Sequence, residues 1–198
     1  MKQQMKLILG STSPRRKEIM EFFSYPFVQA SSDFDESKVA FLGDPKAYVE
    51  QLALEKAHAL KKQFPNDLIL TADTEVYFEG KCLGKPKDEK DAVSMLSGLS
   101  GRWHSVYTGV ALLSPHLSLC EAELTEVECA SLSPDEIHRY LRALHLYDKA
   151  GAYAIQKAGS LIIKQIKGCP YNVMGLPLNT LKKLLHSAGI DLFDYIKS

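Results

Sequence analysis

The sequence lacks the features that would mark a secreted, zinc-clustered or membrane protein. Its four cysteines form no CxxC pair and have no partner histidines at zinc-ligand spacing. The longest run without a charged residue, 103–120, is interrupted by histidine, serine and proline, so it is too polar to span a bilayer. The N-terminal apolar stretch is too short for a signal peptide. We therefore expect a soluble cytoplasmic protein with reduced thiols and no membrane association.

The chain also has no excess of either charge. Lysine plus arginine and aspartate plus glutamate each number 24, so the formal net charge is zero. A neutral chain exerts no general attraction on nucleic acid, and no stripe of interleaved basic and aromatic residues offsets this. We therefore expect no nucleic-acid partner, and an anion site must be a local cluster. The only run of three basic residues is Arg15–Lys17.

Strand and helix signals alternate along the 198 residues without repeats or a long linker, which predicts one domain over 1–198. Apolar runs predict strands, and a capping serine or aspartate predicts a helix start. The expected strands are 6–10, 68–72, 104–113, 117–131 and 160–166. One helix is expected to begin at Pro14, and four further helices are expected over 46–64, 88–96, 133–144 and 178–188. This order favours an α/β (α+β) fold around a mixed sheet.

The first candidate site is the segment from Gly10 to Arg16, where a strand leads through small residues into a helix. Free amides and the helix dipole attract anions to a helix N-terminus. Arg15 and Arg16 lie in the first turn, where their charge opposes the dipole, so a bound anion would account for them. The segment is not a Walker A loop, because GxxxxGK[ST] is absent. The alternative is an ordinary capped helix with solvated arginines.

Asp73 is the candidate for chemistry, because it follows the apolar run 68–72. A carboxylate at the C-terminal end of a strand in an open α/β sheet faces the crevice where ligands usually bind. It could hold magnesium or deprotonate an attacking water. The alternative is a turn aspartate that hydrogen-bonds its own backbone.

Three further polar residues are ambiguous when each is taken singly. Lys85 lies between Gly84 and Pro86, which restrict its direction, and Lys56 lies within the long helix; solvated lysines are the more common reading of both patterns. Gln156 could recognise a base edge, because its amide is both donor and acceptor. No HExxH or GxSxG motif is present.

Together and in this order, these segments resemble the Maf family of nucleotide pyrophosphatases. Seven ordered stretches match and span nearly the whole chain. They are SxSPRR (11–16), LALEKA (52–57), ADT (72–74), LGKPKD (83–88), LSGRWHSVYTGVAL (99–112), DKAGAYAIQ (148–156) and GLPL (175–178). The chain departs from the family pattern at Gly10, where alanine is usual, and at Thr71, where glycine often stands. It also departs at Lys157, where glycine is usual, and in the loop 168–172.

The resemblance implies a two-lobed fold similar to the inosine-triphosphate pyrophosphatases, with a central cleft. By position, Asp73 would be the general base or a metal-linked carboxylate, and Glu36 would be a further ligand of Mg²⁺ or Mn²⁺. The groups that would hold the phosphates are Ser11, Arg15, Arg16, Lys56 and Lys85. The residues that match the branch for dTTP and UTP, rather than 7-methylguanosine triphosphate, are Arg15, Thr74 and Gln156.

The implied activity is hydrolysis of dTTP and UTP to monophosphate and pyrophosphate, which would prevent nucleotide misincorporation and is associated with cell-division arrest. One alternative is a non-catalytic, nucleotide-binding regulator of septum formation. Another is a pyrophosphatase for modified purine nucleotides, and a third is a phosphatase that releases orthophosphate. The oligomeric state stays open, with a homodimer as one option.

Overall fold

A computed structural model describes residues 5–147 and 149–197 of the chain. In this part of the chain, seven strands form one sheet in the order β2-β1-β3-β5-β6-β7, with β4 paired to β3. β1 runs parallel to β2 and β3, and all other pairs are antiparallel. The strands are β1 (Leu7–Leu9), β2 (Phe27–Gln29), β3 (Leu68–Phe78), β4 (Lys81–Leu83), β5 (Trp103–Leu113), β6 (Ser118–Cys129) and β7 (Ile163–Lys167).

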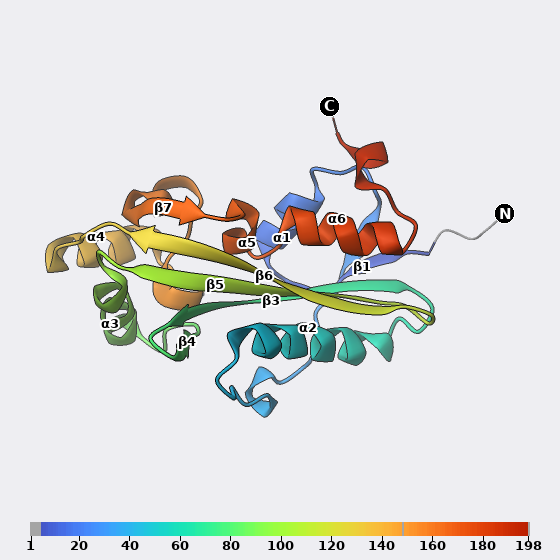
Figure 1. Cartoon of the computed structure of the whole chain (residues 1–198), viewed down its shortest axis with the longest axis horizontal. Helices are drawn as coiled ribbons and strands as arrows, with labels where there is room; N and C mark the ends of the chain where they lie inside the picture. The colour runs from blue at the N-terminus through green and yellow to red at the C-terminus, as the bar shows by residue number, and fades with distance from the viewer. Residues whose placement is uncertain (1–4, 148, 198) are drawn as a thin grey trace.

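Helices cover both faces of this sheet. They are α1 (Pro14–Met20), α2 (Pro45–Lys61), α3 (Glu89–Leu99), α4 (Pro134–Leu144), α5 (Pro170–Met174) and α6 (Leu178–Ser187). Figure 1 shows α2 along one face of β3 and β5, and α1, α5 and α6 on the opposite face. Gly109 on β5 permits the close approach of α2, because a Cβ there would lie 2.2 Å from the carbonyl oxygen of Val49. The predicted mixed α/β fold class is confirmed.

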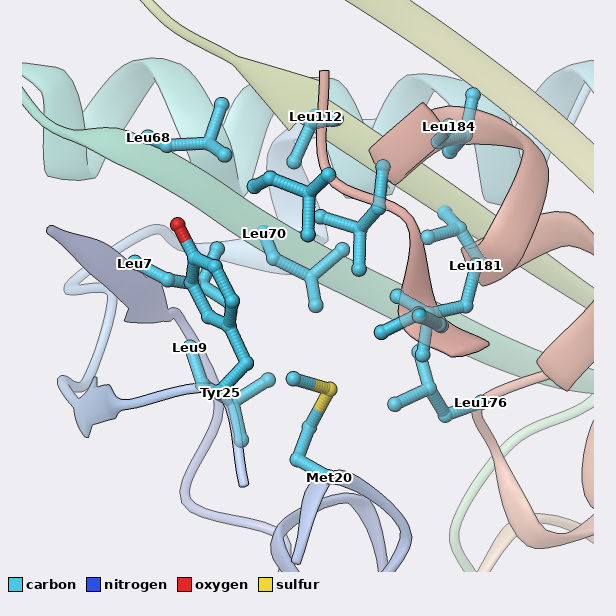
Figure 2. Close-up of a cluster of buried hydrophobic side chains, with 14 of the residues drawn as sticks. Leu7, Leu9, Met20, Tyr25, Leu68, Leu70, Leu112, Leu176, Leu181 and Leu184 are labelled. Atoms are coloured by element: carbon cyan, nitrogen blue, oxygen red, sulfur yellow. The ribbon is translucent and has the colours of Figure 1, made fainter. Parts of the chain in front are cut away.

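The largest cluster of buried apolar side chains lies between the sheet and the helices α1 and α6. Figure 2 shows leucines from β1, β3 and β5 meeting Met20 of α1 and Leu181 and Leu184 of α6. A second cluster lies between the sheet and α2, around Ile8 and Ile69. Because β1 and β3 contribute to both clusters, these two strands are held from both faces, as expected for buried parallel strands.

The helix starts are predicted well because their caps are local. The side chains of Ser13, Asp44, Asp88 and Ser133 each accept a hydrogen bond from a first-turn amide of the helix that follows. Ser133 also forms the expected capping box with Glu136.

Two strand predictions need correction. The strand predicted over 68–72 continues to Phe78, because β5 pairs with it as far as Tyr77 and carries the ladder through the polar residues. The strand predicted over 160–166 is wrong in its first half, where Lys157–Ile162 form a 3₁₀ helix and the strand begins at Ile163. A Cβ at Gly159 in that helix would lie 2.4 Å from the Ala154 carbonyl oxygen, so the chain is tightly folded back there rather than extended. The short elements β2 and α5 were not predicted.

In the described residues, no helix has both the length and the apolar character needed to cross a membrane. The four cysteines are free thiols, in agreement with the prediction of no disulfide.

Candidate active site

An interruption in one edge of β3 creates the site. β1 pairs with β3 over Leu68–Leu70 and β4 pairs with it over Val76–Phe78, so residues 71–75 have no strand partner on that edge within the described chain. A cleft of about 680 Å³ opens beside this stretch. The loop after β1 and the N-terminus of α1 also line the cleft.

The cleft brings together nearly all of the residues proposed from the sequence. Those that line it are Ser11, Arg15, Arg16, Glu36, Lys56, Asp73, Thr74 and Lys85. They come from five separate segments of the chain, which shows that the ordered motifs converge in space. Gln156 is the exception, because it is absent from the lining and its amide donates a hydrogen bond of 3.0 Å to Glu18.

Arg16 is fixed by three segments of the chain. Its Nε donates to the Gly175 carbonyl oxygen at 2.8 Å, Nη1 donates to Ser11 Oγ at 3.2 Å, and Nη2 donates to Thr74 Oγ1 at 3.1 Å. Gly175 has a positive φ of 102°, and a Cβ there would lie 3.4 Å from Arg16 Nε. The positive φ therefore favours glycine here, while a Cβ would only touch the arginine at ordinary contact distance. Burial lowers the pKa of Arg16, while the charge of Asp73 acts in the opposite direction.

A directed chain of hydrogen bonds continues from Arg16 through the sheet. Thr74 Oγ1 lies 2.9 Å from Thr108 Oγ1, and Thr108 Oγ1 donates to the Asn172 carbonyl oxygen at 3.0 Å. Because Thr108 uses its proton on Asn172, the proton between the two threonines must come from Thr74. The Thr74 oxygen is then free to accept from Arg16. The Thr74 hydroxyl, which the sequence resemblance associates with specificity, thus supports Arg16.

Lys56 links two carboxylates on the α2 side of the sheet. Its ammonium donates to Asp73 Oδ1 and lies 2.8 Å from Glu36 Oε1. Lys56 and Asp73 are only 8% and 5% exposed. Burial raises the pKa of Glu36, but the hydrogen bond and charge of Lys56 outweigh this and the pKa is lowered overall. The solvated alternative, which the helical pattern alone favours for Lys56, is therefore wrong, because the residue faces a carboxylate on the neighbouring strand.

Glu75 also lines the cleft, although the sequence reasoning did not single it out. It lies two residues after Asp73 on β3, and alternate residues of a strand point to the same face. Burial, together with the charges of Asp73 and Glu36, raises its pKa to about 8. The signal that could have found it was the strand period, but the apolar run ended at 72 and β3 was predicted too short.

The loop that carries Lys85 is tied to the segment after α4. Gly151 N donates to the Gly84 carbonyl oxygen at 3.1 Å, and Lys149 and Tyr153 line the cleft beside Lys85. The Tyr153 hydroxyl shares a hydrogen bond of 2.7 Å with His104 Nε2. This segment was recognised as a motif, but Asp148 within it lies outside the described residues.

Two departures from the family pattern, Gly10 beside the cleft and the buried Thr71, lie next to each other. A Cβ on Gly10 would lie 2.6 Å from Thr71 Cγ2 and 2.3 Å from Leu60 Cδ1. Thr71 in turn donates a hydrogen bond of 2.6 Å to the Ala53 carbonyl oxygen on α2. The missing methyl group at position 10 makes room for the larger side chain at position 71, so the two departures compensate each other sterically.

The carboxylates of the cleft suit a hard divalent cation. Glu36, Asp73 and Glu75 offer oxygen ligands, and Asp73 Oδ2 and Glu75 Oε2 are buried with no hydrogen-bond partner in the described chain. Within the same residues, no three His, Cys, Asp or Glu side chains are close enough to form a metal cluster by themselves. Magnesium commonly binds to one or two carboxylates and completes its shell with water and substrate phosphates. The side chains present therefore fit a cation that binds together with a phosphorylated ligand.

The fold and the cleft define a class: a mixed α/β protein whose cleft combines basic side chains with buried carboxylates. Comparison with known families is more specific, because the family model described as "Maf-like protein" matches residues 6–188. The chain belongs to the Maf family.

Similar proteins have been named for their activity. The chain is 43% identical over 192 residues to the "Nucleoside triphosphate pyrophosphatase" of Chlamydia muridarum, covering 96% of this chain and 98% of that protein. It is 44% identical over 191 residues to the "dTTP/UTP pyrophosphatase" of Clostridium perfringens, covering 95% and 100%. Among solved structures, the Ham1 protein of Staphylococcus aureus has a similar fold, with a TM-score of 0.53, 14% identity, and coverage of 92% of this chain and 99% of that one.

Proposed function

We propose that this protein hydrolyses nucleoside triphosphates to the monophosphate and pyrophosphate, with dTTP and UTP as preferred substrates. The observation that carries the proposal is the convergence of Arg16, Lys85 and Asp73 in one cleft. The names of the relatives from Chlamydia muridarum and Clostridium perfringens support the same reaction. In a cell, this activity would lower the supply of the hydrolysed nucleotides, which is how it would limit misincorporation or influence division.

In this scheme the basic side chains hold the triphosphate. Three of the five N–H bonds of Arg16 are used within the protein, which leaves two for phosphate oxygens. Arg15 and Lys85 supply further positive charge from the α1 N-terminus and the loop after β4. Fixed cations aimed at the leaving group stabilise the charge that develops on pyrophosphate as the bond to the α-phosphorus breaks.

Asp73 is placed to act on the attacking water. Its Oδ1 accepts from Lys56, while Oδ2 is buried without a partner in the described chain. Oδ2 has two lone pairs: one would accept the water proton as the water oxygen bonds to the α-phosphorus and the pyrophosphate leaves, and the other is left for a cation. Lys56 orients this carboxylate, because its ammonium donates a hydrogen bond to Oδ1 and leaves Oδ2 facing the cleft.

A divalent cation, Mg²⁺ or Mn²⁺, would be bound by Asp73 and by a second carboxylate of the cleft, for which the sequence resemblance indicates Glu36. When bound, it would neutralise phosphate charge and polarise the phosphorus–oxygen bonds. Lys56 contacts the carboxylates of both Glu36 and Asp73, and both carboxylates line the cleft. The oxygen ligands present are therefore consistent with cation binding.

The preference for dTTP and UTP is supported by Arg15 and Thr74, which line the cleft. It is also supported by the names of similar proteins. Gln156 donates to Glu18 instead of lining the cleft, so a direct contact with the base would require it to exchange that partner.

The test is pyrophosphate release from dTTP, UTP, CTP and 7-methyl-GTP in the presence of magnesium, with the products separated by chromatography. We expect monophosphate and pyrophosphate, with the highest kcat/KM for dTTP and UTP. Orthophosphate as the first product would instead show a phosphatase. A preference for the methylated guanine nucleotide would show a pyrophosphatase for modified purines, and nucleotide binding without hydrolysis would favour a regulatory role.

A further inference from the structure

β3 carries a second acidic side chain into the cleft that the mechanism above does not use. Asp73 and Glu75 are two residues apart on a continuous strand, so both point toward the side of the sheet that α2 covers. Both also line the cleft, on the stretch of β3 that has no strand partner on its outer edge in the described chain. The two carboxylates are therefore neighbours on one rigid support.

Each of these carboxylates has one oxygen that lacks a partner. Asp73 is 5% exposed, and Lys56 occupies its Oδ1, whereas its Oδ2 has no hydrogen-bond partner in the described residues. Glu75 Oε2 is likewise buried and has no hydrogen-bond partner in the described residues. Buried polar atoms are nearly always paired, because an unpaired one loses its hydration without compensation. Two such oxygens on one face of one strand indicate that a ligand completes them.

The charges around Glu75 indicate that this ligand is a cation. Asp73 and Glu36 are the negative groups that act on Glu75, and Lys56 and Lys85 are the positive ones. Lys56 already pairs with both Asp73 and Glu36, so its charge is shared between two carboxylates before it reaches Glu75. A further positive charge between Asp73 and Glu75 would relieve the repulsion of three carboxylates in one cleft.

We propose that Glu75 is the second carboxylate ligand, together with Asp73, of the divalent cation that enters the cleft with the triphosphate, while Glu36 keeps its contact with Lys56. The proposal rests on the proposed function, because the phosphates supply the remaining ligands. Two carboxylates with substrate oxygens and water form the usual shell of magnesium at such sites. This also accounts for the lack of a three-residue metal cluster among the described side chains.

The experiment measures Mn²⁺ binding by electron paramagnetic resonance in the presence of a non-hydrolysable α,β-methylene analogue of dTTP. The proteins compared are the wild type, Glu75→Gln, Glu75→Asp and the control Glu79→Gln. Glu79 follows β3 directly and pairs with the exposed Arg102, outside the cleft. We expect both Glu75 variants to bind Mn²⁺ at least about tenfold more weakly, since even indirect support of a metal ligand is worth that much. The control should match the wild type.

The Glu75→Asp variant separates ligation from simple charge. Aspartate keeps the negative charge, but its carboxylate lies one methylene closer to the backbone. If Glu75 binds the cation directly, Mn²⁺ affinity should fall in this variant; if Glu75 acts only through its charge, the affinity should be retained. Wild-type affinity in Glu75→Asp, or in Glu75→Gln, would overturn the proposal, and so would a wild-type protein that does not bind Mn²⁺. Circular dichroism of each variant establishes that the proteins compared are folded.

Pyrophosphate release by the wild type is measured separately, so the two proposals fail in different ways. If the wild type releases pyrophosphate but the Glu75 variants bind Mn²⁺ normally, only the role of Glu75 is lost. If Mn²⁺ binding depends on Glu75 but no pyrophosphate is released, the metal site stands and the proposed reaction is wrong.

Discussion

The buried ammonium of Lys56 donates a hydrogen bond to Asp73 Oδ1, while Asp73 Oδ2 has no hydrogen-bond partner in the described chain. One oxygen of the carboxylate is thus held by the protein and the other remains for substrate, water or metal. The protein therefore orients Asp73 through one carboxylate oxygen and leaves the other without a protein partner in the described chain.

Replacing Asp73 with asparagine should abolish most of the activity without unfolding the protein. Asparagine preserves the shape of the side chain, and Lys56 retains Glu36 as an ionic partner. We expect turnover of dTTP to fall by roughly two to four orders of magnitude, because the amide neither accepts a proton nor carries negative charge. Steady-state pyrophosphate release measures this, with Glu79→Gln as the control. Near-normal turnover in Asp73→Asn would remove the assigned role.

Replacing Thr108 with valine should lower the activity indirectly, because Thr108 positions Arg16 through the hydroxyl of Thr74. Valine removes the acceptor for the Thr74 proton and the donor to Asn172. We expect kcat/KM for dTTP to fall about tenfold, which corresponds to the loss of roughly one good hydrogen bond. Thr108→Ser should retain most of the wild-type kcat/KM, because serine keeps the hydroxyl.

The control for this series is Thr180→Val. Thr180 is also a buried threonine, but its hydroxyl donates to Glu123 and it does not line the cleft. Equal losses of kcat/KM in Thr108→Val and Thr180→Val would point to a general stability effect and would contradict the positioning of Arg16 by Thr108.

Gly10 and Thr71 should be energetically coupled. Gly10→Ala alone places a methyl group against Thr71 and Leu60, so we expect it to lower the free energy of unfolding by about 1–3 kcal/mol. Thr71→Gly alone loses the hydrogen bond to Ala53. In the double variant the clash with Thr71 is absent, so the total loss should be smaller than the sum by about 1 kcal/mol or more. Urea unfolding of the four proteins measures the coupling, and strict additivity would argue against compensation.

Acid should destabilise the protein through His104. Burial lowers the pKa of His104 to about 4, below its ordinary value of 6.5. The unfolded chain therefore binds the proton more readily, so this contribution is fully present above about pH 6.5 and is lost as the pH falls toward 4. Between pH 7.5 and 5 we expect the free energy of unfolding to fall by about 2 kcal/mol from this residue.

Urea unfolding of the wild type and of His104→Gln over this pH range checks the expectation. The variant should show a shallower pH dependence, whereas His138→Gln, at an exposed position on α4, should follow the wild type. Identical slopes for the wild type and His104→Gln would show that another group is responsible.

The sequence was sufficient for the helix starts and for most of the cleft, because both depend on short, local signals. Capping by Ser13 or Asp88 requires only a few adjacent residues. Arg16 and Lys85 were found through their motifs, and the motifs converge as expected.

What the sequence did not reveal depends on contacts between distant segments. β3 extends to Phe78 because β5 pairs with it, and this hidden extension is why Glu75 was missed. The burial of Lys56 follows from Asp73 on the neighbouring strand, which no pattern within α2 indicates. The contact between Gln156 and Glu18 joins residues 138 positions apart, so the local motif could not show that Gln156 lies off the cleft lining.

The pairing of β3 with β5 along its inner edge has a consequence for how members of such a family can diverge. Asp73 is registered against Gly109 within a long antiparallel ladder, so its position is set by the scaffold and not by the surrounding loops. The basic side chains proposed to hold the substrate come instead from the start of α1 and from loops such as the one that carries Lys85. If Asp73 has the proposed catalytic role, substitutions in those loops would change which nucleotide is accepted while the carboxylate stays in place, so evolution could vary substrate choice without altering the sheet.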